Sequence, residues 1–199
     1  MNPIITGNVE VGSHVQLAEF TELVAKGDSI IRLCGYNGIF PFVRIMAEDS
    51  KNQIIIGSNT RIQRRTEVHG DVKIGENTII GPDVFISSGS HLFDFISELT
   101  INEQDILFAS INAGSPSNPV NIGNDVWIGR LVTIMPGVNI GNRSIIGANS
   151  VVTRNVECGE VWAGSPARFL RHRDLAQTRD PGERNSTFTR SSFCTNEPR

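Results

Sequence analysis

Residues 122–152 read IGNDVWIGRLVTIMPGVNIGNRSIIGANSVV, and an aliphatic β-branched residue returns in them at every sixth position. The same spacing runs through residues 56–86, and the interval between the two blocks is itself a multiple of six. The sixth-position residues of both blocks are Ile56, Ile62, Val68, Ile74, Ile80, Ile86, Ile122, Ile128, Ile134, Ile140, Ile146 and Val152. A pattern this regular predicts a repeat architecture, which has to be recognised before any other feature is interpreted.

Each repeat is too short to hold a helix and a strand, so it predicts one short strand followed by a turn. Turn-forming pairs such as Pro82-Asp83 and Asn142-Arg143 recur between the aliphatic residues. Glycine often follows the aliphatic residue, as at Gly75 and Gly129, where the backbone passes close to a corner. Short strands that run the same way around a coil stack as parallel sheets. The repeat therefore predicts an all-β solenoid with one interior column of aliphatic side chains.

These hexads resemble those of the hexapeptide-repeat acyltransferases, and most closely the sugar and polysaccharide O-acetyltransferases, over about 100 residues between Ile56 and Arg171. The resemblance implies a left-handed parallel β-helix with three hexads in each triangular coil. Its left hand comes from the resemblance alone, because ordinary chirality rules favour right-handed crossovers. Twelve hexads then make four coils, and the aliphatic residues between Ile5 and Leu23 add about one more.

Three segments depart from the repeat. Residues 24–55 break the six-residue phase, and residues 92–121 form an excursion of a length that is usually functional or disordered. We therefore expect one β-helix domain over residues 1–166 with these two insertions. From Ala167 we expect a short helix, and beyond it a polar tail to residue 199 that is flexible or docked on a neighbouring subunit.

Composition narrows the class of protein. With 199 residues, 39% of them hydrophobic, the chain is long enough for one domain with a real core. A net charge of −3 argues against a nucleic-acid partner. The cysteines at 34, 158 and 194 lack C-x-x-C spacing and predict free thiols in a reducing compartment. The absence of a leader and of a long apolar run predicts a cytoplasmic protein without a transmembrane segment.

His91 is the first candidate for chemistry, because it stands in residues 88–94, where the first block of repeats stops. A histidine at the mouth of a long loop on a rigid scaffold is well placed to act as a general base. The related enzymes carry a catalytic histidine in a similar Ser/Thr-x-His-x-x-Asp setting, so the resemblance implies the same role for His91. Asp94 would then orient the imidazole, or it caps the loop. The alternative is a solvated surface histidine without a chemical role.

The stretch from Asn121 to Gly141 closely resembles the sugar acetyltransferases, in which the tryptophan borders the thioester end of coenzyme A. Residues 146–155 and 163–171 resemble the terminal signature of the family, in which a small residue faces the pantetheine and basic residues approach the adenine and phosphates. Arginine suits this task because its guanidinium binds phosphate through two donors. The resemblance thus implies coenzyme-binding roles for Trp127, Gly129, Arg130, Ala148, Thr153, Arg154, Arg168 and Arg171. Each alone could also be an ordinary surface residue.

The chain also departs from the family pattern. Arg130 stands where small residues are usual, and Arg154 replaces the commoner lysine. The 36 residues from His91 to Trp127 make a longer interval than in the simple sugar acetyltransferases, which leaves the acceptor open. Three residues at outward turn positions of the coil before His91 are candidates to meet an anionic acceptor, although exposed turn arginines are commonplace. They are Gln63, Arg64 and Arg65.

Together these observations predict transfer of an acetyl group from acetyl-CoA to a hydroxyl of a sugar or surface polysaccharide, with His91 as the base. Family members form homotrimers with sites between subunits, so His91 and Trp127 would come from different chains. Two alternatives stay open: N-acetylation of an amino sugar or xenobiotic, and a non-catalytic β-helix scaffold. A zinc-dependent carbonic anhydrase on the same helix would need three histidine ligands, and His69 and His91 have no convincing third, so we expect no metal.

Overall fold

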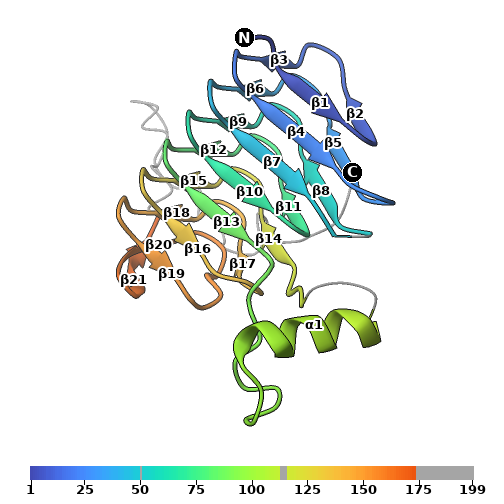
Figure 1. Ribbon diagram of the computed structural model, residues 1–199. Coiled ribbons are helices and arrows are strands. Elements are labelled where there is room, and N and C mark those ends of the chain that lie inside the picture. Colours follow the sequence, from blue (N-terminus) through green and yellow to red (C-terminus); the bar gives the residue numbers. More distant parts are fainter. Residues whose placement is uncertain (50, 113–115, 174–199) are drawn as a thin grey trace, which may run out of the picture.

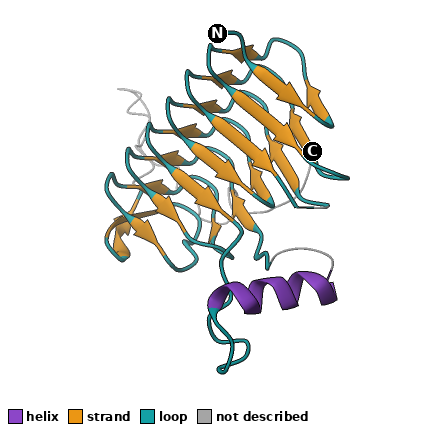
Figure 2. Cartoon of the chain, in the orientation of Figure 1, coloured by secondary structure: helices purple, strands orange, loops and turns teal. Residues whose placement is uncertain are grey.

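The computed structural model describes residues 1–49, 51–112 and 116–173, which wind into a parallel β-solenoid of about seven coils (Figures 1 and 2). Each side of the solenoid is one sheet of strands from successive coils. Strands pair with the coils above and below in parallel, apart from one antiparallel pair at the last coil. The prediction of an all-β parallel β-helix is therefore confirmed.

The described residues form three sheets, which we name A, B and C in the order in which the chain passes through them. Sheet A contains β1 (Ile4–Thr6), β4 (Glu22–Ala25), β7 (Arg44–Ala47), β10 (Glu67–His69), β13 (Phe85–Ser87), β16 (Thr133–Ile134) and β19 (Val151–Val152). Sheet B contains β2 (Val9–Val11), β5 (Ile30–Leu33), β8 (Gln53–Ile56), β11 (Val72–Ile74), β14 (Val120–Ile122) and β17 (Asn139–Ile140). Sheet C contains β3 (Gln16–Leu17), β6 (Gly38–Ile39), β9 (Arg61–Ile62), β12 (Ile79–Ile80), β15 (Trp127–Ile128), β18 (Ile145–Ile146), β20 (Glu160–Gly164) and β21 (Ala167–His172).

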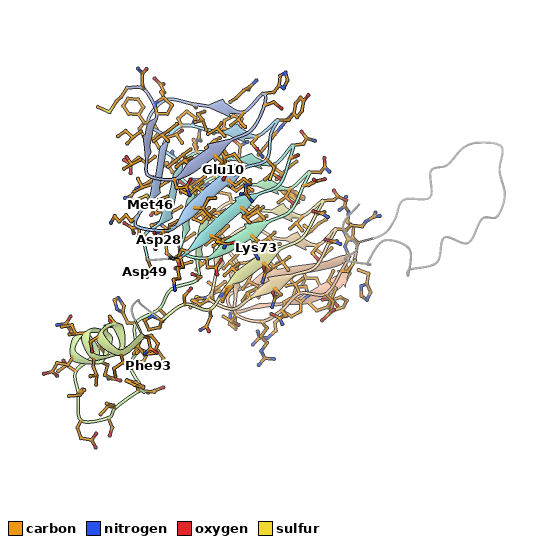
Figure 3. The ribbon with its side chains drawn as sticks, turned by 90° about the vertical axis from the view of Figure 1, so that its right-hand side faces the viewer. Glu10, Asp28, Met46, Asp49, Lys73 and Phe93 are labelled. Atoms are coloured by element: carbon orange, nitrogen blue, oxygen red, sulfur yellow. The ribbon has the colours of Figure 1, made fainter. Side chains whose placement is uncertain are left out.

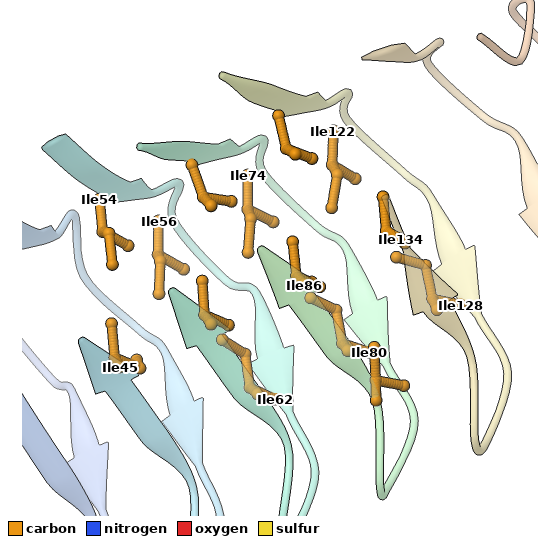
Figure 4. Packing of buried hydrophobic residues seen from close by; sticks show 14 of the residues in the cluster. Ile45, Ile54, Ile56, Ile62, Ile74, Ile80, Ile86, Ile122, Ile128 and Ile134 are labelled. Atoms are coloured by element: carbon orange, nitrogen blue, oxygen red, sulfur yellow. The ribbon is translucent and has the colours of Figure 1, made fainter. Parts of the chain in front are cut away.

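The core is the interior column that the hexads predict. Successive residues of a strand point to opposite faces, so the two-residue strands of the later coils point one residue inward and longer strands such as β8 and β11 point two. All twelve sixth-position aliphatic residues are at most 3% exposed, and they stack from coil to coil (Figure 4). Buried threonines at the corners donate their hydroxyls to backbone carbonyls, as Thr66 does to Gly81 over 2.9 Å. The interior is therefore apolar, with its few polar groups satisfied.

Glycines at the corners are required by the close stacking of the coils. A Cβ on Gly75 would lie 2.6 Å from the carbonyl carbon of Gly123 in the next coil. One on Gly129 would lie 2.6 Å from the backbone nitrogen of Ala148. Both distances are shorter than any real Cβ contact, so a larger residue would push the coils apart. The prediction that these glycines mark tight corners is confirmed.

The prediction that residues 24–55 leave the repeat is wrong. They supply strands to all three sheets, from the end of β4 to β8, and pair in register with the coils on either side. The phase breaks because two corners between sheets A and B are longer than the others, at residues 26–29 and 48–52. Extra residues at a corner project away from the stack, so the strands below it keep their pairing.

The number of residues between paired strand positions shows where the coils are longer. In sheet A, Glu22 pairs with Arg44, 22 residues along, whereas Glu67 pairs with Phe85, 18 residues along. The long excursion between β13 and β14 leaves the solenoid at this same A–B corner. All the lengthened connections of the described coils are therefore aligned along one edge of the solenoid.

The excursion contains the α-helix α1 (Ile101–Asn112), the one helix that the described residues form, which stands away from the coils in Figure 1. A capping box starts this helix, because Glu103 accepts the backbone N–H of Thr100 at 2.9 Å and Thr100 Oγ1 accepts that of Glu103 at 3.4 Å. The excursion ends at Val120, where β14 begins, slightly before the expected boundary at residue 121. The sequence predicted the excursion but not its helix.

The prediction of a helix from Ala167 is also wrong. Residues 167–172 form β21, which turns back at Ser165-Pro166 and pairs antiparallel with β20. The open edge of β20 supplies backbone partners that a helix would leave unused, so the segment extends along it. This hairpin joins residues on both sides of the boundary expected at 166. The predicted polar tail from residue 174 lies outside the described residues.

The cysteine prediction holds only in part. Cys34 is free and exposed, whereas Cys158 is disulfide-bonded, so the expectation of free thiols is wrong for Cys158. Cys194 lies outside the described residues.

Adjacent residues of β12 allow a test of the inward-facing column. Ile80 is 0% exposed, and Ile79 beside it is 47% exposed. We expect Ile80→Ala to lower the free energy of unfolding by about 2–5 kcal/mol through lost contacts and a cavity. Ile79→Ala, the matched outward control, should cost less than about 1 kcal/mol. Urea unfolding followed by circular dichroism measures both, and equal losses would contradict the assignment of the two faces.

Candidate active site

His91 lies just beyond the A–B corner from which the excursion leaves, and its side chain is 82% exposed. Its Nδ1 is 2.6 Å from Oδ2 of Asp105, which comes from α1. The other carboxylate oxygen, Oδ1, accepts the backbone N–H of Leu92 at 2.9 Å. The Leu92 N–H, and after it the His91 imidazole, holds the pKa of Asp105 below its usual value. An ionised carboxylate at Nδ1 favours the tautomer whose Nε2 is free to accept a proton.

Asp105, rather than Asp94, therefore orients the imidazole. Asp94 is exposed and makes no hydrogen bond to His91 among the described residues. Asp105 was missed because it lies 14 residues further along, and only the fold of the excursion brings it back to His91. The Thr100-x-x-Glu103 capping box is the sequence signal from which the helix carrying Asp105 could have been found.

The position of α1 relative to His91 is fixed by Gln104, which is 2% exposed. Its Oε1 accepts the backbone N–H groups of Phe95 and Ile96 at 2.8 and 3.0 Å. Its Nε2 donates to the carbonyl of Leu99 at 3.1 Å. These bonds tie the loop that follows His91 to the helix that carries its partner, so the pair belongs to a preorganised unit.

Trp127 projects outward from β15 in the middle of sheet C and is 55% exposed. It stacks between Ile79 and Ile145 of the neighbouring strands, and the three side chains form an apolar strip along this sheet. In a triangular coil, sheet C is the side opposite the A–B corner, and Figure 1 shows β15 and the excursion on different sides of the solenoid. One chain therefore does not bring Trp127 and His91 together.

The other predicted coenzyme residues lie on sheet C, at the A–B corner of the last coil and, for Arg130, at the C–A corner. Ala148 is exposed at the end of the sheet C strip, with Gly129 buried against its backbone. Arg168 and Arg171 belong to β21 at the end of the same sheet. Two further residues, Thr153 and Arg154, are exposed after β19, at the A–B corner of the last coil. The structure therefore does not gather all of these residues on one face of a single chain.

Arg130 and Arg65 share one carboxylate at the C–A corner. Asp83 accepts a hydrogen bond from Arg65 Nε at 2.6 Å and another from Arg130 Nε at 3.0 Å. Arg65 first, and more weakly Arg130, lowers the pKa of Asp83, while partial burial opposes them. Gln63, which is half-buried, and Arg64, which is exposed, lie in the same turn. This corner precedes sheet A whereas His91 follows it, so within one chain these residues lie at the far end of the sheet A strands from His91.

Residues 53–88 and 119–154 match the model of a protein family that is described as "bacterial transferase hexapeptide (six repeats)". The galactoside O-acetyltransferase of Escherichia coli is 41% identical over 100 residues, which cover 50% of this chain and 43% of that protein. A solved hexapeptide-repeat-containing acetyltransferase from Vibrio cholerae superposes with a TM-score of 0.54 at 30% identity, over 69% of this chain and 72% of that one. The chain belongs to the hexapeptide-repeat transferase family.

A further relative of this hexapeptide-repeat chain is a galactoside acetyltransferase that was solved in complex with coenzyme A. It superposes with a TM-score of 0.53 at 28% identity, covering 83% of this chain and 65% of that one. The hexapeptide-repeat chain spans about half the length of the curated relatives it matches, from 42% to 62% of the first three.

Sequence reasoning also missed a small pocket that the hexapeptide-repeat chain forms at the root of the excursion. Its volume is about 110 Å³, and it is lined by the 48–52 corner, by His69 and by the Ser88 and Ser117 side chains. His69 Nε2 lies 3.0 Å from Glu67 Oε2. Within the residues that the structure describes, no three His, Cys, Asp or Glu side chains lie close enough together to hold a metal ion. Nor does the described chain contain a helix long and apolar enough to cross a membrane.

Proposed function

We propose that this protein is an acetyl-CoA-dependent O-acetyltransferase that acts on a hydroxyl of a sugar or glycan. The observation that carries the proposal is the His91–Asp105 pair, an exposed imidazole held by a carboxylate 2.6 Å from its Nδ1. A base for a large hydroxylated acceptor must be accessible, and His91 is. The galactoside acetyltransferase relatives support a sugar as the acceptor.

In this proposal His91 Nε2 removes the hydroxyl proton while the hydroxyl oxygen attacks the acetyl carbonyl. Asp105 stabilises the imidazolium that forms, and His91 then returns the proton to the leaving thiolate. Acetyl-CoA supplies the activated thioester. The acceleration comes mainly from holding the two substrates in line.

The residues of sheet C fit the coenzyme as its binding surface. Trp127 and its aliphatic neighbours offer an apolar wall, and the small exposed Ala148 side chain beside them leaves room for an extended chain to lie close to the coil. In this proposal Arg168 and Arg171 at the end of the sheet, together with the exposed Arg154 of another subunit, bind its phosphates.

A homotrimer is the assembly that we propose to unite the two halves of the site. His91 at the A–B corner and Trp127 on sheet C face different directions in one chain. Packing the A–B edge of one subunit against sheet C of the next brings them together, and threefold symmetry repeats the contact in a closed ring. Each of the three sites then contains His91 from one subunit and Trp127 from its neighbour.

The proposed activity is tested by measuring thiol release from acetyl-CoA with a panel of simple sugars, polysaccharides, amino sugars and hydroxylated antibiotics. We expect release with a hydroxylated sugar, and a product that alkaline hydroxylamine cleaves as an ester. A hydroxylamine-stable amide as the main product would support N-acetylation instead. Absence of release with every acceptor would support the scaffold alternative and contradict the proposal.

Mixed trimers test the shared site. His91→Ala and Trp127→Ala proteins should each be weakly active, the first in kcat and the second through a KM for acetyl-CoA raised about tenfold. When the two are unfolded together and refolded as a mixture, about a quarter of the sites regain both side chains if each site joins neighbouring subunits. Thiol release should rise accordingly above that of either variant refolded alone. A mixture no more active than the average of its components would exclude a shared site.

A further inference from the structure

The outer face of sheet B, which none of the predicted site residues occupies, carries a groove of about 450 Å³. It runs over β11, β14 and β17 to the last coil. Its floor is a row of asparagines at outward positions of three successive coils, Asn121, Asn139 and Asn155. Its other end is formed by Ile55 of β8 and Lys73 of β11, and Lys73 is labelled in Figure 3 with Glu10 of the same sheet.

The asparagine row is an ordered ladder. Asn121 Nδ2 donates to Asn139 Oδ1 at 2.8 Å, and Asn155 Oδ1 accepts the backbone N–H of Asn139 at 2.9 Å. A carboxamide has two N–H donors and an oxygen that accepts twice, so these bonds use only part of its capacity. The Oδ1 of Asn121 accepts nothing from the described residues. The ladder therefore presents fixed donors and acceptors to whatever lies in the groove.

A hydroxyl group both donates and accepts, which makes a row of neutral amides complementary to a polyhydroxylated ligand. Successive coils are about 4.8 Å apart, so the row offers the same polar group at a regular interval along the solenoid. A ligand that matches it is itself a chain of repeating units. Among the described residues that line the groove, the charged ones are Lys73 and Glu157, of opposite sign, so the groove favours a neutral chain over an acidic one.

The groove also begins where the excursion returns to the solenoid. The backbone N–H of Asn118, two residues before β14, donates to the carbonyl of Ser88 at 2.8 Å and closes the root of the excursion. Asn121 is the middle residue of β14 and so follows directly. A chain lying on sheet B therefore leads to the excursion that carries His91. Sheet C presents apolar groups such as Trp127 outward, whereas the outward strand residues that line the groove on sheet B are polar apart from Ile55, as on a face left to solvent in an assembly.

We propose that the sheet B groove binds a run of a neutral polysaccharide and presents its reacting sugar to His91. This inference rests on the proposed function for the last step, whereas the binding itself requires no acetyl transfer. The amides of Asn121 and Asn139 contact hydroxyl groups of the sugars that flank the reacting one. The groove thus selects a polymer over a free sugar.

Binding is tested by affinity electrophoresis of the His91→Ala protein in gels that contain dextran, galactan or, as the acidic polymer, alginate. We expect at least one neutral polymer to retard the protein, and Asn121→Thr/Asn139→Thr to raise the dissociation constant about tenfold. Threonine suits an outward strand position. If the double variant is unstable, the dissociation constant of the single Asn121→Ser variant is measured in its place. Glu10→Gln, on the same sheet but outside the groove, is the matched control and should not change the retardation.

Three outcomes would overturn the inference: no retardation by any neutral polymer, equal retardation of the asparagine variants, or retardation by alginate alone that Lys73→Gln abolishes. Activity separates this inference from the proposed function. In the catalytically competent protein, the double variant should raise KM about tenfold for the polymer and leave KM for the free sugar unchanged. Retardation without thiol release from acetyl-CoA would reject the acetyltransferase proposal and support polysaccharide binding in the groove. Thiol release without retardation would support the acetyltransferase proposal and reject binding in the groove.

Discussion

Replacing His91 by alanine is expected to lower kcat for acetyl transfer by about 10²–10⁴-fold, the usual contribution of a positioned general base. In the proposed mechanism the imidazole accepts the hydroxyl proton, and its partner Asp105 is held ionised by the Leu92 N–H and is too weak a base to replace it. Because His91 is 82% exposed, its loss opens no cavity, and the melting temperature should stay within a few degrees of the wild-type value.

The measurement is steady-state thiol release with the best acceptor of the screen, together with the dissociation constant of coenzyme A. Coenzyme affinity should not change, since the residues assigned to it lie elsewhere. His14→Ala is the matched control: His14 is an exposed histidine, stacked on Tyr36 with ring centroids 4.6 Å apart in the first coils, and its loss should leave kcat unaltered. Full activity of His91→Ala would refute the general-base assignment.

Asp105→Asn is expected to lower kcat by about 10–100-fold, while Asp94→Asn leaves it unchanged. The amide can still accept the Leu92 N–H, so the loop keeps its anchor. It no longer supplies the negative charge that fixes the tautomer of His91 and stabilises the imidazolium during transfer. The two variants make the same chemical change on the same excursion, so their difference reports the hydrogen bond to His91 alone.

The pH dependence separates this positioning role from a structural one. The lowered pKa of Asp105 keeps its carboxylate ionised below the usual range, so its stabilising effect is present at neutral pH and is lost only as the pH falls through that lowered value. In the wild-type protein kcat should therefore fall as the pH drops through the lowered pKa of Asp105, because the protonated carboxyl no longer carries a negative charge beside His91. Asp105→Asn has no carboxylate to protonate, so this step should be absent from its pH profile. The same step in Asp105→Asn, or an equal loss of kcat in Asp94→Asn, would contradict the role of Asp105.

The coils from Ile56 onward could be predicted from sequence because each of them contains 18 residues and three strands, except where the excursion intervenes. Between residues 24 and 55 the coils are equally regular in space, but corners of different length shift the phase. A fixed period detects strands only when the connections have constant length. The hydrogen bonds that hold β5 and β8 in register come from neighbouring coils, and no local pattern records them.

The candidate site, too, contains some residues that sequence patterns indicate and others that only the fold reveals. His91 and Trp127 belong to short motifs with a fixed relation to the repeat, so sequence reasoning located both. The partner of His91 depends on how α1 packs through the buried Gln104, a contact between segments that the one-dimensional pattern does not relate. At the last coil the sequence predicts a short helix from Ala167, yet the free edge of β20 decides the conformation.

The alignment of every lengthened connection on the A–B edge has a consequence for how this chain can be altered. Strands on all three sides keep their partners whatever the length of those corners, as the coils before and after residues 26–29 and 48–52 demonstrate. The described parts of the excursion, residues 88–112 and 116–119, leave and rejoin the solenoid at the same edge, between two strands that stay paired with their neighbours. We therefore expect the excursion to be exchangeable between relatives: the proposed base, the carboxylate beside it and the acceptor preference would move together, and the pairing of the coils would not change.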